Sequence, residues 1–312
     1  MVIQKPSEIK EKEGKINIFS LDKTISSIPK KNIQPIINFN NFIKTSETSE
    51  DPLGSLNDKP IIYIDDIYLS LKEEEKVICK TIDEDYLQIQ TDVNEQMRGI
   101  LIDWIIEVNL KFKLREETLF LTVNLIDRFL SKNIINRSKL QLLGVASMFI
   151  ACKFEEIYTP HIKDFVYITD NAYSIKDILD MEVQILNTIK YNVLAPTPLQ
   201  FFELIAKFFN FNHKEFLFGR YLIESFLIDY KSIKYLPSLI ACTAAYITMK
   251  FFKHKNYQAI YHGIFSPNIV LLKDCAKKIC YLVDNLQNSN LNSVKKKFSR
   301  KEYLQVACMN FS

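Results

Sequence analysis

Glycine is scarce in this chain, with only 6 residues in 312, and tryptophan occurs only once. Phenylalanine and tyrosine are plentiful instead, with 22 and 15 residues. Runs that alternate apolar and polar residues, as strands do, are rare, whereas apolar residues recur at helical spacing through most of the chain. Few glycines, many bulky aromatic residues and weak strand signals together predict an all-α fold with aromatic cores.

A strong charge of either sign is also missing, because 40 lysines and arginines face 37 acidic residues, a net charge of +3. The basic clusters at 30–31 and 295–297 are short, so we expect no direct nucleic-acid partner. The longest charge-free apolar run, 140–152, falls short of the roughly 20 residues that span a bilayer, so no membrane partner is expected. Lys5 and Glu8 argue against a signal peptide.

The six cysteines are scattered without a C-x-x-C pair, which favours a reducing compartment, the nucleus and/or the cytoplasm. His161 lies near Glu155 and Glu156, but this spacing matches no metal-ligand pattern, so neither a metal nor a cofactor is expected. No glycine-rich phosphate loop, nucleophile elbow or paired-carboxylate motif is found either. The sequence therefore predicts no catalytic site.

Several parts of the chain differ in composition. Residues 1–60 are polar and predicted to be disordered, and 61–96 hold a short amphipathic helix, with Tyr63, Ile67 and Leu71 on one side, and a linker. Two helical domains, 97–195 and 196–312, follow. Each has a central helix with a belt of small residues, and these two helices start on the order of 100 residues apart, as expected for a duplicated domain. A first helix is expected to start after a cap at Asn94 and to include 97–107. Further helices are expected at about 116–131, 138–153, 161–167, 174–189, 198–209, 213–230, 236–252 and 268–286, with a short one between the last two.

The helix that contains the single tryptophan is apolar on two faces. Its apolar residues fall into a narrow stripe and a separate, broader arc. The stripe contains Met97, Leu101, Trp104 and Val108, and the arc contains Ile102, Ile105, Ile106 and Leu110. Glu107 borders the stripe. Because a globular core needs one face only, the second face is a candidate docking surface.

Two charges fall where apolar residues are expected. Arg98 lies inside the broad arc, and Asp127 lies inside an apolar arc of the following helix. An unpaired charge is costly to bury, so one explanation is a buried Arg98–Asp127 ion pair. The other is that both side chains reach solvent at the helix edges, and the periodicity favours neither.

Six blocks in order carry a family resemblance: MRGILIDWIIEV, LFLTVNLIDRFLS, KLQLLGVASMFIACKFEEIY, DFVYITDNAYS, ILDMEVQIL and KYLPSLIA. Together, over roughly 61–305, they resemble the cyclins, most closely the mitotic A/B type. The resemblance implies two tandem five-helix cyclin boxes preceded by an N-terminal helix. It also implies a non-catalytic subunit that forms a heterodimer with a cyclin-dependent protein kinase, activates it and controls S phase or entry into mitosis.

The resemblance also assigns roles to single residues. It implies a buried structural ion pair between Arg98 and Asp127, which favours the first of the two explanations above. Its kinase-binding positions are Lys153, Glu182, Phe154, Glu155, Leu186, Tyr191, Ile67 and Tyr63. Its docking patch for substrate or inhibitor peptides of Arg-x-Leu type comprises Met97, Leu101, Trp104, Glu107, Arg137, Leu140 and Gln141. Glu107, together with Asp103, is expected to bind the peptide arginine.

The sequence departs from the family pattern in three ways. Gly99 stands where alanine is usual, and Ser70 where an aromatic residue is common. Residues 1–97 contain neither an R-x-x-L nor a K-E-N motif, which argues against the ubiquitin-dependent destruction typical of A/B-type cyclins.

Two other functions are compatible with the pattern. A cyclin-fold adaptor or transcription-type cyclin would share the fold without activating a cell-cycle kinase. If it bound DNA, that binding would depend strongly on salt. A helical enzyme with an unrecognised site would show turnover in the rigorous absence of any kinase.

Overall fold

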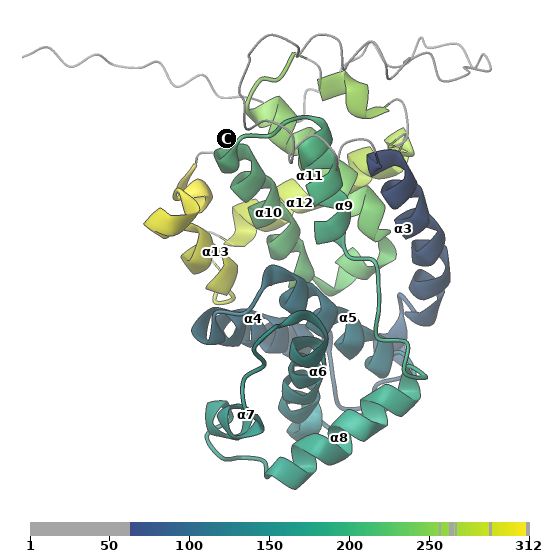
Figure 1. Cartoon of the computed structure of the whole chain (residues 1–312), viewed down its shortest axis with the longest axis vertical. Helices are drawn as coiled ribbons and strands as arrows, with labels where there is room; N and C mark the ends of the chain where they lie inside the picture. The colour runs from purple at the N-terminus through teal and green to yellow at the C-terminus, as the bar shows by residue number, and fades with distance from the viewer. Residues whose placement is uncertain (1–62, 256, 262–264, 266, 287–288, 310–312) are drawn as a thin grey trace, which may run out of the picture.

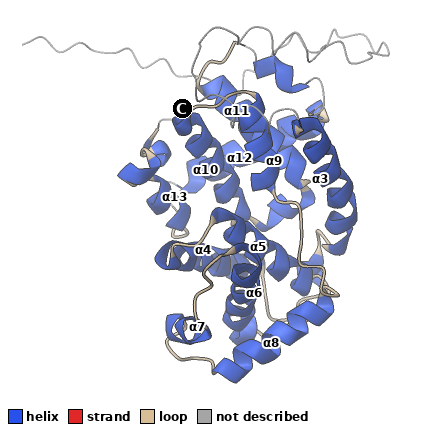
Figure 2. Cartoon of the chain, viewed as in Figure 1, coloured by secondary structure: helices blue, strands red, loops and turns tan. Residues whose placement is uncertain are grey.

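The computed structural model describes residues 63–255, 257–261, 265, 267–286 and 289–309, and every regular element among them is helical (Figure 2). The all-α prediction is therefore confirmed. The segment predicted to be disordered, 1–60, lies outside the described residues. No helix in the described part is both long and apolar enough to cross a bilayer. The α-helices are α3 (Ile64–Ile78), α4 (Glu95–Phe112), α5 (Glu116–Leu130), α6 (Leu140–Glu155), α7 (Ile162–Ile168), α8 (Ile175–Thr188), α9 (Pro198–Phe208), α10 (His213–Leu227), α11 (Pro237–Phe251), α12 (Ile269–Leu286) and α13 (Ser293–Phe298).

Helices α4–α8 form a first bundle around α6 (Figure 1). The small residues of α6 let its neighbours approach closely. At Gly144, a methyl group would lie 2.8 Å from Cδ1 of Leu101 on α4, so any larger residue would force the Leu101 side chain to move. The central position predicted for this helix is the one observed.

Helices α9–α12 form a second bundle around α11, which contacts α9, α10 and α12 (Figure 1). The segment between α11 and α12 contributes the 3₁₀ turn η6 (Tyr257–Tyr261). Gly219 of α10 lies against the ring of Phe202, and a methyl group there would meet Cζ at 2.0 Å. Nearly all buried apolar side chains of both bundles belong to one continuous cluster.

The predicted helix starts are confirmed, and side chains stabilise them. Asn94 accepts a hydrogen bond from the backbone N–H of Met97 at 3.0 Å. Ser174 and Thr197 begin α8 and α9 with capping boxes, and Pro198 occupies the first position of α9. The helix predicted over 213–230 ends earlier, at Leu227, and the chain continues into the 3₁₀ turn η5 (Tyr230–Lys234).

Helix α3 packs on the second bundle with a face different from the predicted stripe. Its buried residues include Ile64 and Tyr68, whereas Tyr63 and Ile67 are 58% and 45% exposed. The Tyr68 ring fits between Phe201 and Phe265 of the second bundle, with ring centroids 5.4 and 5.0 Å away. Because Tyr68 fits between these two rings, the helix turns Tyr68 toward the second bundle and leaves Ile67 exposed. The predicted linker after α3 contains two 3₁₀ turns, η2 (Cys79–Thr81) and η3 (Tyr86–Gln88).

Arg98 and Asp127 meet in the core at the junction of the two bundles. Two parallel hydrogen bonds of 2.8 Å join Nε and Nη2 of Arg98 to the two carboxylate oxygens. Arg98 also donates to the backbone carbonyl of Leu227 at 3.0 Å, and the Tyr86 hydroxyl donates to Asp127 at 2.8 Å. Burial opposes the charge on Arg98, but the Asp127 carboxylate raises the pKa of the guanidinium above its usual value. The charge therefore persists in the core.

Candidate binding surfaces

The first surface lies where the C-terminal end of α6 meets α8 (Figure 1). Lys153, in the last turn of α6, forms an ion pair with Glu182 of α8. The Lys153 side chain is 44% exposed and the Glu182 side chain 10% exposed. The ammonium also lies 4.2 Å from the centroid of the Phe149 ring. Because Glu182 and Phe149 hold the lysine, its charge is displayed at a fixed place on the surface.

Large exposed apolar side chains lie near this ion pair in the sequence of both elements. Phe154 is 50% exposed, and Ile157 and Tyr158 in the following loop are 88% and 91% exposed. On α8, Leu179 and Val183 are 42% and 53% exposed. Single exposed apolar residues are ordinary, but several of them within a few residues of an ordered ion pair indicate a protein-binding surface.

The other predicted kinase-binding residues have different environments. Tyr191 follows α8 with a positive φ of 59° and is 66% exposed, whereas Leu186 packs partly into the core. Glu155 is half-buried, and burial together with the negative charge of Glu117 raises the pKa of its carboxyl. Tyr63 and Ile67 of α3 point outward, as noted above.

The second surface follows α4, which supplies the predicted docking stripe. Met97 and Trp104 are half-buried and pack against the core. Leu101 is only 5% exposed and Leu140 of α6 only 6%, so these two supply little accessible surface. Arg137 begins the 3₁₀ turn η4 (Arg137–Lys139), and its side chain is 71% exposed and lies 3.8 Å from that of Asp92. Gln141 of α6 is half-buried.

Ile100 belongs to this surface, and the sequence prediction omitted it. Its side chain is 51% exposed, and it lies three residues after Met97 and four before Trp104, on the same helix face. The sequence shows this spacing, but it does not show that Leu101 is buried and that its neighbour Ile100 is exposed. The exposed apolar surface therefore depends on Met97, Ile100 and Trp104.

The two carboxylates of α4 have different roles. Asp103 accepts hydrogen bonds from the backbone N–H and the hydroxyl of Ser293 at 3.0 and 2.7 Å, so it holds the start of α13. Burial raises the pKa of Asp103, although these hydrogen bonds oppose the shift. Glu107 lies 3.0 Å from the same Ser293 hydroxyl and competes with Asp103 for its single hydrogen, and the Glu107 side chain is 53% exposed. Asp103 is thus engaged within the fold, and Glu107 is the carboxylate presented to solvent.

Two family models match the chain: the cyclin N-terminal domain over residues 66–194 and the cyclin C-terminal domain over residues 196–312. A G2/mitotic-specific cyclin-2 of Medicago sativa is 38% identical over 244 residues, which cover 77% of this chain and 73% of that one. The chain belongs to the cyclin family.

A G2/mitotic-specific cyclin-B of Dictyostelium discoideum is 35% identical over 251 residues, 79% of this cyclin and 57% of that protein. Among solved structures, a viral cyclin from herpesvirus saimiri superposes with a TM-score of 0.62 at 18% identity, covering 73% of this chain and 99% of that one. This likeness supports the cyclin fold. The match covers only 57 to 60% of the length of this cyclin-B and of two B2-type cyclins of Arabidopsis thaliana.

This cyclin has no group of three histidine, cysteine or acidic side chains that could hold a metal ion, within the part of the chain described above. Its two surfaces instead combine exposed apolar side chains with a few ordered charges. That chemistry suits protein and peptide partners.

Proposed function

We propose that this cyclin binds and activates a cyclin-dependent protein kinase at the transition from G2 to mitosis. The observation that carries the proposal is the Lys153–Glu182 ion pair, in which a buried glutamate holds a lysine that is 44% exposed, with exposed apolar side chains near it in the sequence. The curated relatives described above bear the names of G2/mitotic-specific cyclins, which supports this timing over a transcription-type role.

The proposed activation is a shift between two states of the kinase. A kinase transfers phosphate only when its catalytic lysine pairs with a glutamate of its αC helix and its activation loop is ordered. A rigid surface that binds αC in this position better than in the inactive one raises the active population. The continuous core beneath α6 and α8 provides such rigidity.

Helix α3 would add a second contact to the kinase. It is fixed to the second bundle by its buried face, so Tyr63 and Ile67 are presented outward on an ordered element. A surface contributed by two separate elements holds a partner in one orientation more tightly than either element alone.

The test reverses both charges at once, with Lys153→Glu and Glu182→Lys. The internal ion pair can re-form in reversed order, so folding should survive, whereas the kinase groups that face the pair would meet the wrong signs. We expect the double variant to lose kinase binding in a pull-down and to lose stimulation of a cyclin-dependent kinase on a histone-type substrate.

The matched control reverses Lys234 and Asp274, an exposed pair with a 3.3 Å separation on the second bundle. This control should bind and stimulate the kinase as the unaltered chain does. Unchanged binding by the Lys153/Glu182 variant would contradict the proposal.

The α4 surface is proposed to dock Arg-x-Leu peptides, with the leucine on Met97, Ile100 and Trp104 and the arginine on Glu107. Met97→Ala combined with Trp104→Ala should weaken peptide binding about tenfold in fluorescence polarisation without changing kinase binding. Ile100→Ser removes only an exposed side chain and provides a second variant with little effect on folding. Parallel loss of kinase and peptide binding in both variants would show that the two surfaces are not separate.

A further inference from the structure

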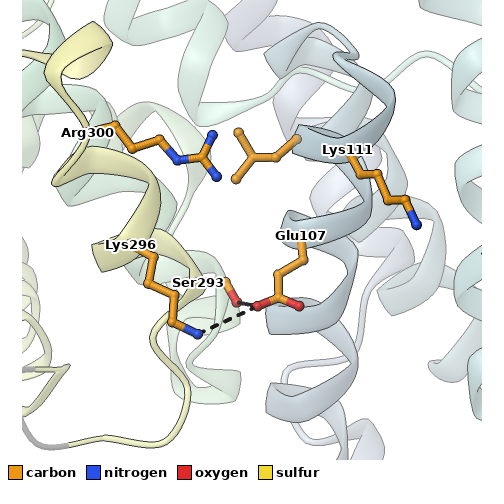
Figure 3. Close-up of a pocket in the computed structure, with 6 residues that line it drawn as sticks. Glu107, Lys111, Ser293, Lys296 and Arg300 are labelled. Carbon is orange, nitrogen blue, oxygen red and sulfur yellow. Dashed lines mark hydrogen bonds and ion pairs between the residues drawn. The ribbon is translucent and has the colours of Figure 1, made fainter.

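A pocket of about 400 Å³ opens between α4 and α13, immediately beside Glu107 (Figure 3). Glu107 and Leu110 line it from α4, and Lys296 and Arg300 line it from the opposite side. Lys111 also borders the pocket, but its ammonium turns away from it in Figure 3. Two cations therefore face a hollow whose other wall carries one carboxylate and a leucine.

The pocket continues the line of the docking surface along α4. Met97, Ile100, Trp104 and Glu107 follow one another at spacings of three and four residues on one helix face, and Leu110 lies three residues further. At a rise of about 1.5 Å per residue, the pocket extends along α4 from Glu107 to Leu110, roughly 5 Å further from the apolar residues. An extended peptide covers that distance in about two residues.

We infer that this pocket binds an anionic side chain, a carboxylate or a phosphoryl group, about two residues before the arginine of a docked Arg-x-Leu peptide. The inference rests on the docking function proposed above. Because the peptide leucine follows its arginine, a peptide with leucine on Trp104 and arginine on Glu107 directs its preceding residues toward Lys296 and Arg300.

The two cations are available to a ligand because their present partners hold them weakly. Lys296 lies 4.0 Å from Glu107, with its side chain 67% exposed. Arg300 pairs with Glu302 at 3.3 Å, and these side chains are 53% and 62% exposed. Exposed ion pairs of this kind contribute little, so a ligand anion can replace them. Once a peptide arginine engages Glu107, Lys296 loses part of its counter-charge, which favours an anion in the pocket further.

The surface would then recognise a pattern of charges as well as the leucine. A negative residue before the arginine would strengthen docking, and a positive residue there would meet Lys296 and Arg300 and weaken it. A phosphoryl group carries more charge than a carboxylate and accepts more hydrogen bonds, so phosphorylation at this position would raise affinity for the docking surface.

The test measures binding of fluorescent Arg-x-Leu peptides to the full chain by fluorescence polarisation. Three peptides carry serine, glutamate or phosphoserine two residues before the arginine, and a fourth carries the glutamate after the leucine. We expect glutamate before the arginine to tighten binding about three- to tenfold relative to serine, phosphoserine to tighten it more, and glutamate after the leucine to change little.

The Lys296→Gln/Arg300→Gln variant should bind the serine peptide nearly as the unaltered chain does but lose the gain from glutamate and phosphoserine. Lys301→Gln is the matched control, because Lys301 is an exposed neighbour that does not line the pocket, and it should keep the gain. Absence of the gain in the unaltered chain, or its persistence in the double variant, would overturn the inference while leaving docking itself intact. Failure of the serine peptide to bind at all would overturn the docking proposal, and the pocket inference with it.

Discussion

At the scale of single residues, the Arg98–Asp127 pair shows that two charges at apolar helix positions can indicate a buried ion pair. The sequence places both charges inside apolar arcs, which leaves two explanations open. The structure joins them by two 2.8 Å hydrogen bonds and adds partners from distant segments, Tyr86 and the carbonyl of Leu227. Periodicity along one helix could not reveal those partners, because they come from 12 residues before Arg98 and from the second bundle.

Removing Arg98 should therefore destabilise the whole protein. Arg98→Ala leaves the Asp127 carboxylate buried with only Tyr86 as a donor, which should cost about 3–5 kcal/mol. Chemical denaturation measures this loss. Arg137→Ala, which removes an arginine whose side chain is 71% exposed, is the control and should change the free energy of unfolding by less than about 0.5 kcal/mol. A loss below about 1 kcal/mol for Arg98→Ala would mean that the pair does not stabilise the core as described.

At the scale of elements, α3 shows how tertiary contacts choose the face of a helix. Its sequence predicted an amphipathic helix, but the packed face includes Tyr68 and Glu75. Glu75 is 1% exposed and accepts hydrogen bonds from the backbone N–H and the hydroxyl of Ser238, in the first turn of α11, at 2.7 and 2.9 Å. A buried glutamate that satisfies the start of another helix cannot be recognised from the spacing of apolar residues.

Glu75 should thus anchor α3. Glu75→Ala leaves the Ser238 N–H without its acceptor and should cost about 2–4 kcal/mol in chemical denaturation, because hydrogen bonds to buried charges are the stronger ones. Hydrogen exchange of the α3 amides should accelerate more than that of α6. Glu73→Ala, which removes an exposed carboxylate of the same helix, should leave both measurements nearly unchanged. Equal effects of the two substitutions would contradict the anchoring role.

At the scale of the whole molecule, charged contacts join the two bundles. Arg220 of α10 lies 2.5 Å from Glu116 of α5 and 3.1 Å from Glu224, and Lys297 of α13 donates to Glu224 at 2.7 Å. Burial alone would raise the pKa of Glu116, but the charges of Arg220 and Lys297 hold it below its usual value. The folded state therefore keeps Glu116 ionised over a range of acidic pH in which the unfolded chain takes up a proton.

This shift makes the joint between the bundles sensitive to acid. Since the folded pKa of Glu116 is lowered, its contribution to stability is present at neutral pH and is lost as pH falls through that lowered value. At pH 7, the free energy of unfolding should be higher for the unaltered chain than for the Glu116→Gln variant. This difference in stability should shrink as the pH falls below the usual pKa range of glutamate. Denaturation at a series of pH values measures this, and a difference independent of pH would contradict it.

The helical class, the helix starts and the family can all be predicted without the fold. These depend on local signals such as Asn94, Ser174 and Thr197 at helix starts, and on blocks of residues in a fixed order. The tertiary structure decided which residues are accessible: it buried Leu101, exposed Ile100, engaged Asp103 with Ser293 and placed Lys296 and Arg300 across from Glu107. Hydrogen bonding at a helix start involves neighbours in the chain, whereas exposure depends on segments that approach from nearly 200 residues away.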